Sequence, residues 1–233
     1  VIQGIMNTIQ AYSLHAVDTG GESSQTMTVN RIQRFCIQDG PGLRTTVFTQ
    51  RCSLGCWWCH NPDTIPAAHP NGEIVSVKAL ADVVLRDALF WQKGQGGLTV
   101  SGGECLLQAD GVAELFRRVK TYDAAIHCTV DTGGNVPLGH VQKVIPVTDL
   151  FLWDFKAVTP ERFHRGTGGR VEISLRNLNW VLTETTVPVI LRIPLIHGFN
   201  ACDDELIRMA KTIAALPVSR GRDLTLEILP GHR

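Results

Sequence analysis

Residues 43–62 read L-R-T-T-V-F-T-Q-R-C-S-L-G-C-W-W-C-H-N-P, a strand-like run that leads directly into a loop with three cysteines. We expect residues 43–49 to form a strand. Cys52, Cys56 and Cys59 then follow with the spacing C-x3-C-x2-C. A cubane iron–sulfur cluster held by four cysteines has no open coordination position, whereas three cysteines leave one iron free to bind a small molecule. The loop therefore predicts a cluster at which a reaction takes place.

Two other metal sites fit parts of the same loop. Residues 56–60 match C-x-x-C-H, the attachment signature of haem c. That attachment needs an oxidising compartment, and we find no basic region, apolar run and cleavage site typical of a signal peptide at the amino terminus. A structural zinc ion could use the three cysteines and His60, although zinc modules usually pair C-x2-C with a distant second half. Three unligated cysteines so close together would be prone to oxidation.

Composition favours one cytoplasmic α/β domain. The chain has 233 residues, 44% of them hydrophobic, which is enough for a substantial core. Its 22 basic and 22 acidic residues give no net charge, and this balance does not favour nucleic acid as a partner. No apolar run approaches the roughly 20 residues of a membrane-spanning helix. The seven cysteines indicate a reducing compartment and metal binding, with Cys36, Cys105, Cys128 and Cys202 expected to be unligated.

Residues 1–28 have a different pattern from the rest. A polar, glycine-containing run over residues 18–26 ends this pattern. We expect an N-terminal extension, either disordered or an amphipathic helix that docks on a partner, with Met27 as an alternative start of the protein. Its apolar residues recur at helical spacing, at Ile2, Ile5, Met6, Ile9, Tyr12 and Ala16.

From residue 29 to residue 233, strand-like and helix-like segments alternate. Six such βα units in series imply a parallel sheet. Because a full eight-stranded barrel typically needs about 250 residues, we expect a partial (β/α)6 TIM-like barrel, with a doubly wound α/β fold as the alternative. Ser76 is a plausible N-cap for the first helix. The strands are expected at 43–49, 97–101, 125–130, 150–155, 188–193 and 224–229, and the helices at 77–92, 109–121, 136–145, 175–185 and 203–216.

Polar motifs follow the expected strands. In barrel enzymes the carboxyl ends of the strands carry the chemistry, so their shared position indicates a site. Each motif alone is weak evidence, because a glycine pair also makes turns and an aspartate also caps helices. The motifs are the cysteine loop, G-G-E (102–104), D-T-G-G (131–134), W-D-F-K (153–156), R-I-P (192–194) and L-P-G-H (229–232).

Together these motifs resemble those of the radical S-adenosylmethionine superfamily, whose hallmark is a C-x3-C-aromatic-x-C loop. The chain is most similar to the glycyl-radical-enzyme activating enzymes, which include pyruvate formate-lyase activating enzyme. The resemblance runs from about residue 30 to the end. Its most specific parts are D-G-P-G-L-R (39–44), the cysteine loop with H-N-P (60–62) and S-G-G-E (101–104).

The resemblance implies the cofactors and their contacts. One 4Fe–4S cluster is expected on Cys52, Cys56 and Cys59, with S-adenosylmethionine chelating the open iron and a monovalent cation beside it. Glu104 would hold the amino group of the cofactor, and Lys156 and Arg192 its carboxylate and ribose. No further cluster is expected, because residues 60–104 contain no cysteine. The implied cofactor contacts are Trp58, Cys59, His60, Gly102, Gly103, Glu104, Asp131, Thr132, Asp154, Phe155, Lys156, Arg192 and His232.

The implied activity is the activation of a partner protein. A reduced cluster would cleave S-adenosylmethionine to a 5′-deoxyadenosyl radical, which abstracts hydrogen from a backbone glycine of a glycyl radical enzyme. Beyond cluster and cofactor, no catalytic residue is expected. Asp39, Gly40, Pro41 and Gly42 would grip the partner loop, since glycines allow another backbone to approach closely. A flavodoxin or ferredoxin-type protein would supply the electron.

Two other functions use some of the same features. A small-molecule radical enzyme similar to 7-carboxy-7-deazaguanine synthase would share the cluster and G-G-E, but D-G-P-G-L-R and C-H-N-P argue against it. A zinc-stabilised binding domain without turnover would use only the cysteines. Two departures from the family pattern stand out: D-T-G-G replaces the commoner D-T-N-G, and Cys105 follows G-G-E.

Overall fold

The computed structural model describes residues 25–65, 72–218 and 224–231. Most of the expected extension over residues 1–28 lies outside these ranges, as does His232. Within the described residues, no helix is long and apolar enough to cross a membrane.

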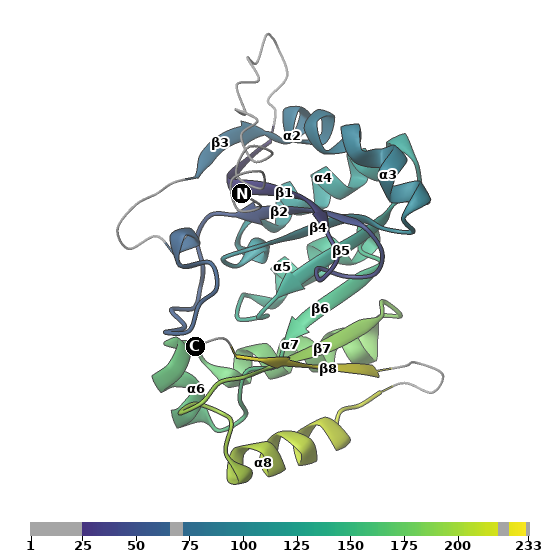
Figure 1. Ribbon diagram of the computed structural model, residues 1–233. Helices are drawn as coiled ribbons and strands as arrows, with labels where there is room; N and C mark the ends of the chain where they lie inside the picture. The colour runs from purple at the N-terminus through teal and green to yellow at the C-terminus, as the bar shows by residue number, and fades with distance from the viewer. Residues whose placement is uncertain (1–24, 66–71, 219–223, 232–233) are drawn as a thin grey trace, which may run out of the picture.

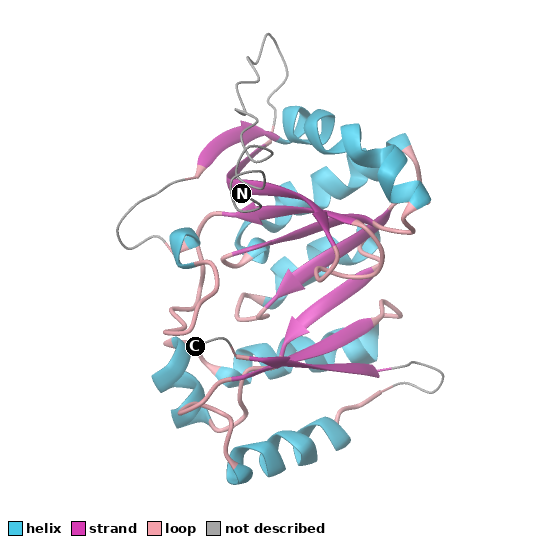
Figure 2. Ribbon diagram, in the orientation of Figure 1, coloured by secondary structure: helices cyan, strands magenta, loops and turns pink. Residues whose placement is uncertain are grey.

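One eight-stranded sheet organises the molecule, and it does not close into a barrel (Figures 1 and 2). Its strand order is β3-β1-β2-β4-β5-β6-β7-β8. The six strands from β2 to β8 are parallel, which confirms the expected partial (β/α)6 barrel. These strands are β2 (Arg44–Thr49), β4 (Gly97–Gly102), β5 (His127–Thr132), β6 (Leu150–Asp154), β7 (Val189–Leu195) and β8 (Leu224–Pro230).

Two antiparallel strands that the sequence did not predict extend one edge of the sheet. They are β1 (Thr26–Cys36) and β3 (Glu73–Ser76). The register between β1 and β2 shifts twice, between Val29 and Arg31 and between Gln33 and Cys36. Such irregularities interrupt the alternation of apolar and polar residues, which is the pattern by which a strand is predicted. The first three residues of β1 fall within the range expected for the extension.

The helices lie along the outer face of the curled sheet (Figure 1). Ser76 caps α2 as expected, since its hydroxyl accepts a hydrogen bond from the Ala79 N–H at 3.1 Å. The predicted helix over residues 77–92 is divided by a 3-10 turn, and the helix over Pro160–Thr167 was not predicted. The helices are α2 (Val77–Val84), α3 (Ala88–Lys93), α4 (Ala109–Tyr122), α5 (Leu138–Val144), α6 (Pro160–Thr167), α7 (Val171–Glu184) and α8 (Asp203–Ala214), with 3-10 turns at Pro62–Thr64, Leu85–Asp87, Cys105–Gln108 and Ile145–Val147.

Alternation along each strand separates the core from the site. Val47, Val100 and Val130 belong to the main buried cluster between the sheet and the helices. The intervening positions face the inside of the curl, because successive side chains of a strand point to opposite faces. Those positions place polar and charged side chains such as Ser101 and Asp131 against an internal cavity. The fold therefore gathers polar groups from distant segments inside an apolar shell.

We expect the folded domain to begin at β1, the first strand among the described residues. Deleting residues 1–24 is expected to change the free energy of unfolding by no more than about 0.5 kcal/mol, the usual range for changes outside a core. Deleting residues 1–28 is expected to lower it by about 2–5 kcal/mol, because Met27 is 1% exposed and residues 26–28 pair with β3. Urea unfolding followed by circular dichroism measures both. Equal stability of the two truncations would contradict this boundary.

Candidate functional site

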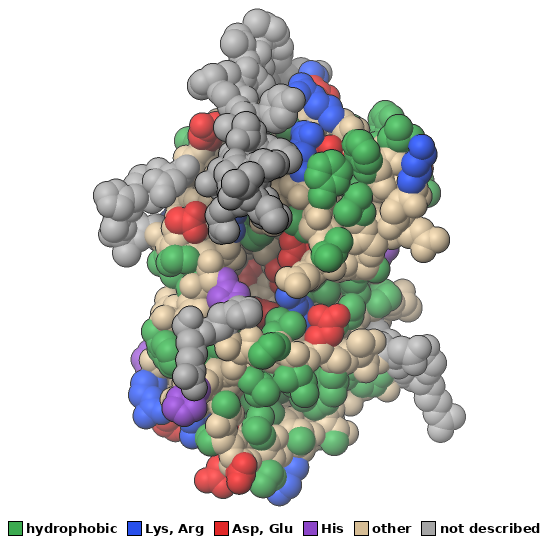
Figure 3. Space-filling view, in the orientation of Figure 1, with side chains coloured by type: hydrophobic (Ala, Val, Ile, Leu, Met, Phe, Trp, Pro, Cys, Tyr) green, Lys and Arg blue, Asp and Glu red, His purple; other side chains and the backbone are tan. Residues whose placement is uncertain are grey.

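A cavity of about 500 Å³ lies inside the curl of the sheet. Figure 3 shows a hollow with acidic and basic side chains at its centre. Phe155 is only 3% exposed and lies in the core behind the cavity, while Gly40, Pro41 and Gly42 do not line it. The expected site residues in its wall are Asp39, Cys52, Cys56, Trp58, Cys59, His60, Gly102, Gly103, Glu104, Asp131, Thr132, Asp154, Lys156 and Arg192.

The cysteine loop leaves the carboxyl end of β2 and is held against α6. The Gly55 N–H donates to the Thr167 carbonyl at 2.7 Å, and the Cys59 N–H donates to the Cys56 carbonyl at 3.1 Å. The Trp58 ring packs on Phe199 with centroids 4.2 Å apart. These contacts fix a loop that has little regular structure of its own. All three cysteines are half-buried and turn towards the cavity.

Two of the loop thiols, those of Cys52 and Cys56, lie in surroundings that bear on metal binding. Burial raises the pKa of Cys52 to about 12 and also raises the pKa of Cys56, while the nearby Lys156 ammonium favours the thiolate of both. The Leu54 N–H points at Cys52 Sγ, 3.4 Å away. A metal must displace the thiol protons, and N–H groups directed at sulfur are a usual feature of iron–sulfur sites. Among the described residues, no group of three or more His, Cys, Asp or Glu side chains is arranged to hold a single metal ion.

The Gly102–Gly103 turn, at the end of β4, is hydrogen-bonded to the start of the cysteine loop. The Gly103 N–H donates to the Thr49 carbonyl at 3.1 Å, and the Glu104 N–H donates to the Arg51 carbonyl at 2.8 Å. A Cβ on Gly102 would lie 2.2 Å from Thr49 N, and one on Gly103 would lie 2.2 Å from Arg51 O. The glycines are therefore required by the protein's own backbone. This contact sets the position of Glu104 relative to the cysteines.

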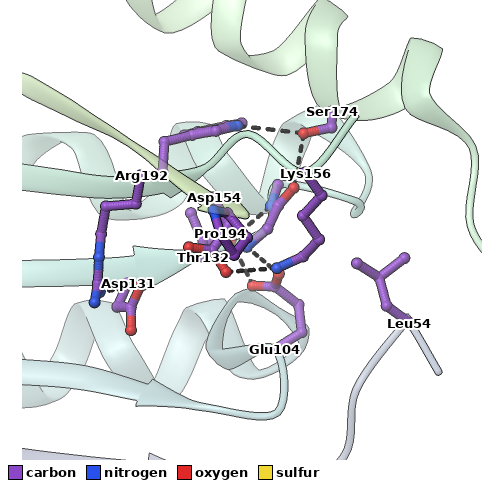
Figure 4. A network of polar contacts seen from close by, with 12 residues as sticks. Leu54, Glu104, Asp131, Thr132, Asp154, Lys156, Ser174, Arg192 and Pro194 are labelled. Carbon is purple, nitrogen blue, oxygen red and sulfur yellow. Dashed lines mark hydrogen bonds and ion pairs between the residues drawn. The ribbon is translucent and has the colours of Figure 1, made fainter. Parts of the chain in front are cut away.

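Glu104 is a buried carboxylate that forms no ion pair with the described residues. It is 1% exposed and accepts hydrogen bonds from the Thr132 hydroxyl at 2.7 Å and from the Leu106 and Gly133 N–H groups at 3.1 Å each. Burial raises its pKa to about 7 in spite of these bonds. None of the ion pairs formed by the described residues includes it, although Lys156 approaches from the opposite wall (Figure 4). The site thus offers a desolvated acceptor for a cationic group.

Two acidic and two basic side chains lie across three neighbouring strands (Figure 4). Asp154 on β6 lies directly opposite Arg192 on β7, and Asp154 forms an ion pair with Lys156. Arg192 forms an ion pair of 3.4 Å with Asp131 on β5, whose other oxygen accepts from the Ser101 hydroxyl at 2.7 Å. The network holds the four charges together in the cavity wall.

The charges of this network shift one another's pKa values. Burial raises the pKa of Asp131 to about 6, although Arg192 favours its ionised form. Burial disfavours the charge on Lys156, but the Asp154 carboxylate holds its pKa above the ordinary value. Arg192 Nε is buried and donates no hydrogen bond within the described structure, its nearest carboxylate oxygen being that of Glu227 at 3.7 Å. A ligand with an acceptor group would satisfy it.

The D-T-G-G turn shows why its two glycines differ. Gly134 has φ +67°, and a Cβ there would lie 2.0 Å from the Trp153 ring, so glycine is required. A Cβ on Gly133 would meet its nearest neighbour, a Leu54 methyl group, at 3.3 Å. A side chain at Gly133 would therefore require Leu54 to shift by a few tenths of an ångström, a smaller conflict than at Gly134. The Gly133 carbonyl accepts from the Ser174 hydroxyl at 2.7 Å, which in turn accepts from the Trp153 indole N–H.

The D-G-P-G segment lies at the opposite end of β2 from the cysteine loop. Asp39 lines the cavity, with its carboxylate accepting from the Thr46 hydroxyl at 2.7 Å and its carbonyl accepting from Thr99 at 2.6 Å. Gly40 and Gly42 have φ values of +118° and +70°, which glycine adopts without strain. The cavity thus reaches from the cysteines at one end to Asp39 at the other.

Arg44 is a structural member of this region that the sequence reasoning did not single out. It is fully buried, and its guanidinium donates to the Leu98, Pro41 and His127 carbonyls and to the hydroxyls of Thr99 and Thr129. Burial lowers its pKa to about 10, so it stays charged near neutrality. It ties the D-G-P-G segment to β4 and β5. Its place as the last residue of D-G-P-G-L-R was the available signal.

Comparison with known proteins identifies the family. The model of the Radical SAM superfamily matches residues 46–210. A pyruvate formate-lyase-activating enzyme from Streptococcus mutans is 35% identical over 214 residues, covering 89% of this chain and 78% of that protein. The chain is a radical SAM enzyme of the glycyl-radical-enzyme activating family. Members of this family use a 4Fe–4S cluster and S-adenosylmethionine, which are therefore its cofactors.

Two further comparisons agree with this assignment. The (2S)-3-sulfopropanediol sulfolyase activating enzyme of Bilophila wadsworthia is 27% identical over 270 residues, covering 91% of this chain and 87% of that protein. The crystal structure of a radical SAM methyltransferase from Sphaerobacter thermophilus matches with a TM-score of 0.56 at 14% identity, over 91% of this chain and 75% of that chain. The second likeness shows the fold alone.

The cavity fits the cofactors of the radical SAM family. Its volume lies within the range of about 300–1,000 Å³ common for small-molecule sites. The amino acid moiety of S-adenosylmethionine carries one ammonium and one carboxylate group. Within the described part of the chain, the cavity presents a buried carboxylate at Glu104 that forms no ion pair and a donor at Arg192 Nε that makes no hydrogen bond. The three thiols supply the donor type that iron–sulfur clusters use. We infer that these groups hold the cluster and the cofactor.

Replacing any one of Cys52, Cys56 or Cys59 with alanine is expected to remove most of the bound iron without unfolding the protein. Two thiolates hold a cubane poorly, and the main buried cluster contains none of the three residues. Iron analysis of anaerobically reconstituted protein, beside far-ultraviolet circular dichroism, measures both properties. Cys36→Ala is the matched control, because Cys36 lines the same cavity outside the loop. Iron retained by all three loop variants would show that the ligands are wrong.

Proposed function

We propose that this protein activates a glycyl radical enzyme by taking a hydrogen atom from one of its backbone glycines. The observation that carries the proposal is the single cavity that Asp39 shares with the cysteine loop and Glu104. A glycine brought to Asp39 would face the cofactor without leaving the cavity. The named relatives from Streptococcus mutans and Bilophila wadsworthia are activating enzymes, which supports the same activity here.

Each charged group has a defined task in this proposal. When bound, the reduced cluster and S-adenosylmethionine supply a carbon-centred radical by one-electron cleavage of the cofactor. Glu104 would accept hydrogen bonds from the cofactor's amino group, in place of water, inside a site too dry to solvate it. Lys156 and Arg192 would face the anionic and hydroxyl groups of the cofactor. The far side of the cofactor would face Asp131, Thr132 and Asp154, with a small cation as a further ligand.

Asp39 would orient the partner backbone. Its carboxylate has one oxygen engaged by the Thr46 hydroxyl, and its carbonyl is fixed by Thr99, so the side chain is held in place before the partner arrives. A carboxylate held in this way is suited to accept backbone N–H groups of an incoming loop. The buried Arg44 fixes the turn behind it through the Pro41 carbonyl. Preorganisation of this kind lowers the entropy cost of positioning a substrate.

The electron and the compartment complete the proposal. A flavodoxin or ferredoxin-type protein would reduce the cluster, because the chain itself is expected to hold only one. The three half-buried loop thiols would have to remain unoxidised until iron is bound, which is consistent with a cytoplasmic protein.

A glycine-centred doublet in the electron paramagnetic resonance spectrum of the partner tests the activity. Cofactor cleavage without that doublet on any glycyl radical enzyme would contradict it.

Asp39→Asn is expected to separate cofactor cleavage from partner activation. The amide oxygen can still accept from Thr46, so the turn is retained, but the charge that would bind the partner backbone is lost. A hydrogen bond to a charged group contributes about 1.5–3 kcal/mol, which corresponds to roughly tenfold to hundredfold slower activation at limiting partner. Cleavage of S-adenosylmethionine by the reduced enzyme should persist.

Glu104→Ala provides the contrast. Because Glu104 is assigned to the cofactor, this variant is expected to lose cofactor cleavage and partner activation together. Both activities are followed in one assay, by chromatography of 5′-deoxyadenosine and by spin counting on the partner. The assignment of Asp39 fails if Asp39→Asn activates the partner at the unmodified rate, or if the two variants lose both activities in parallel.

A further inference from the structure

An irregularity in β1 turns an aromatic side chain out of the sheet beside the cavity. Between Gln33 and Cys36, β1 contains one more residue than the facing part of β2, which is the signature of a β-bulge. Phe35 lies within it and has φ +59°, a conformation that is unusual for a bulky residue. Bulges commonly redirect a side chain next to an active site. Here the strained residue is 48% exposed.

Two more apolar side chains extend the surface around Phe35. Ile37 is 76% exposed, and Phe90 on α3 is 47% exposed, with its ring edge-on to Phe35 at 5.3 Å between centroids. Figure 3 shows hydrophobic side chains gathered on the α3 side of the central hollow. We refer to Phe35, Ile37 and Phe90 as the apolar lip. Exposure of three large apolar side chains in one place is a feature of binding surfaces.

The lip is continuous with the cavity. Phe35 and Ile37 line it, followed two residues later by Asp39. Leu229 and Pro230, at the end of the edge strand β8, line the cavity as well, from the opposite side of the unclosed sheet. A partner loop that enters between β1 and β8 to reach the cysteine loop therefore passes over the apolar lip. The lip belongs to the route into the site.

We propose that the apolar lip is the docking surface for the glycine-bearing loop of the partner enzyme, and that it binds apolar side chains next to the target glycine. The inference rests on the proposed function and adds a source of affinity to the backbone contacts at Asp39. The three side chains are too few for a stable dimer of this chain, since a standard interface buries about 800 Å² on each side. A loop inserted into the cavity needs only such a small anchor.

Ile37→Ser and Phe35→Asn test the surface. Asparagine tolerates a positive φ, and Ile37 is largely exposed, so both variants should fold. Loss of one large apolar side chain that the partner loop buries on binding should raise the KM for the partner about tenfold. The kcat and the rate of S-adenosylmethionine cleavage without partner should stay within about twofold, because no cofactor contact changes. The partner is a purified glycyl radical enzyme that the unmodified chain activates, beginning with pyruvate formate-lyase.

Matched controls lie elsewhere on the surface. Ile74→Ser replaces an isoleucine that is 75% exposed on β3, and Tyr122→Asn replaces an aromatic residue that is 63% exposed at the end of α4. Neither lines the cavity, so both should retain the unmodified KM. An unchanged KM in both lip variants, or an equal increase in the controls, overturns the proposal. A change in oligomeric state on sedimentation, confined to the lip variants, would instead assign the surface to self-association and overturns it too.

The assay also distinguishes failure of the proposed function from failure of the docking surface. If the unmodified chain cleaves the cofactor but activates no glycyl radical enzyme, the proposed function is wrong and the docking surface is wrong with it. If the unmodified chain activates the partner and the lip variants do so with the same KM, only the docking surface is wrong.

Discussion

The backbone contact between the end of β2 and the Gly102–Gly103 turn determines the geometry of the site. Two carbonyls of the segment entering the cysteine loop accept N–H groups from Gly103 and Glu104. The chains approach so closely that a Cβ on either glycine would lie 2.2 Å from a backbone atom. The thiols and the buried carboxylate of Glu104 are therefore held in a fixed relation, although they belong to segments about fifty residues apart.

Electrostatics in the cavity follow from this arrangement. The carboxylate of Glu104 is desolvated and forms no ion pair with any residue that the structure describes, and burial raises its pKa to about 7. The other charges are paired in the network of Asp131, Asp154, Lys156 and Arg192. Buried charges are usually paired, so an unpaired one at a cavity wall indicates where a ligand's opposite charge belongs. A ligand with an ammonium and a carboxylate group would satisfy both the Glu104 carboxylate and the Arg192 donor.

The sequence predicted the parts that depend on local pattern. Both ends of all six parallel strands were predicted to within two residues, because buried parallel strands form short apolar runs followed by turn residues. The strand β1 was missed because its bulge disrupts the alternation, and the same bulge creates the exposed position of Phe35. Gly102 and Gly103 were expected to contact the cofactor, which stays a prediction, and the structure adds a second requirement for glycine there, the close approach of the chain's own backbone. Contacts between distant segments, such as those of Arg44, leave no periodic signal.

The affinity of Gly103→Ala for S-adenosylmethionine tests whether the contact between the end of β2 and the Gly102–Gly103 turn determines the geometry of the site. The added Cβ would force Arg51 O, and with it the cysteine loop, away from Glu104. A displacement of about 1 Å at such a site can lower the reaction rate about a hundredfold. We predict at least about tenfold weaker binding of S-adenosylmethionine in equilibrium dialysis of the iron-loaded variant. Gly139→Ala is the control, because a Cβ there would meet nothing within 4 Å and the residue does not line the cavity, so it should bind within about threefold of the unmodified protein. Unmodified affinity in Gly103→Ala would contradict the account.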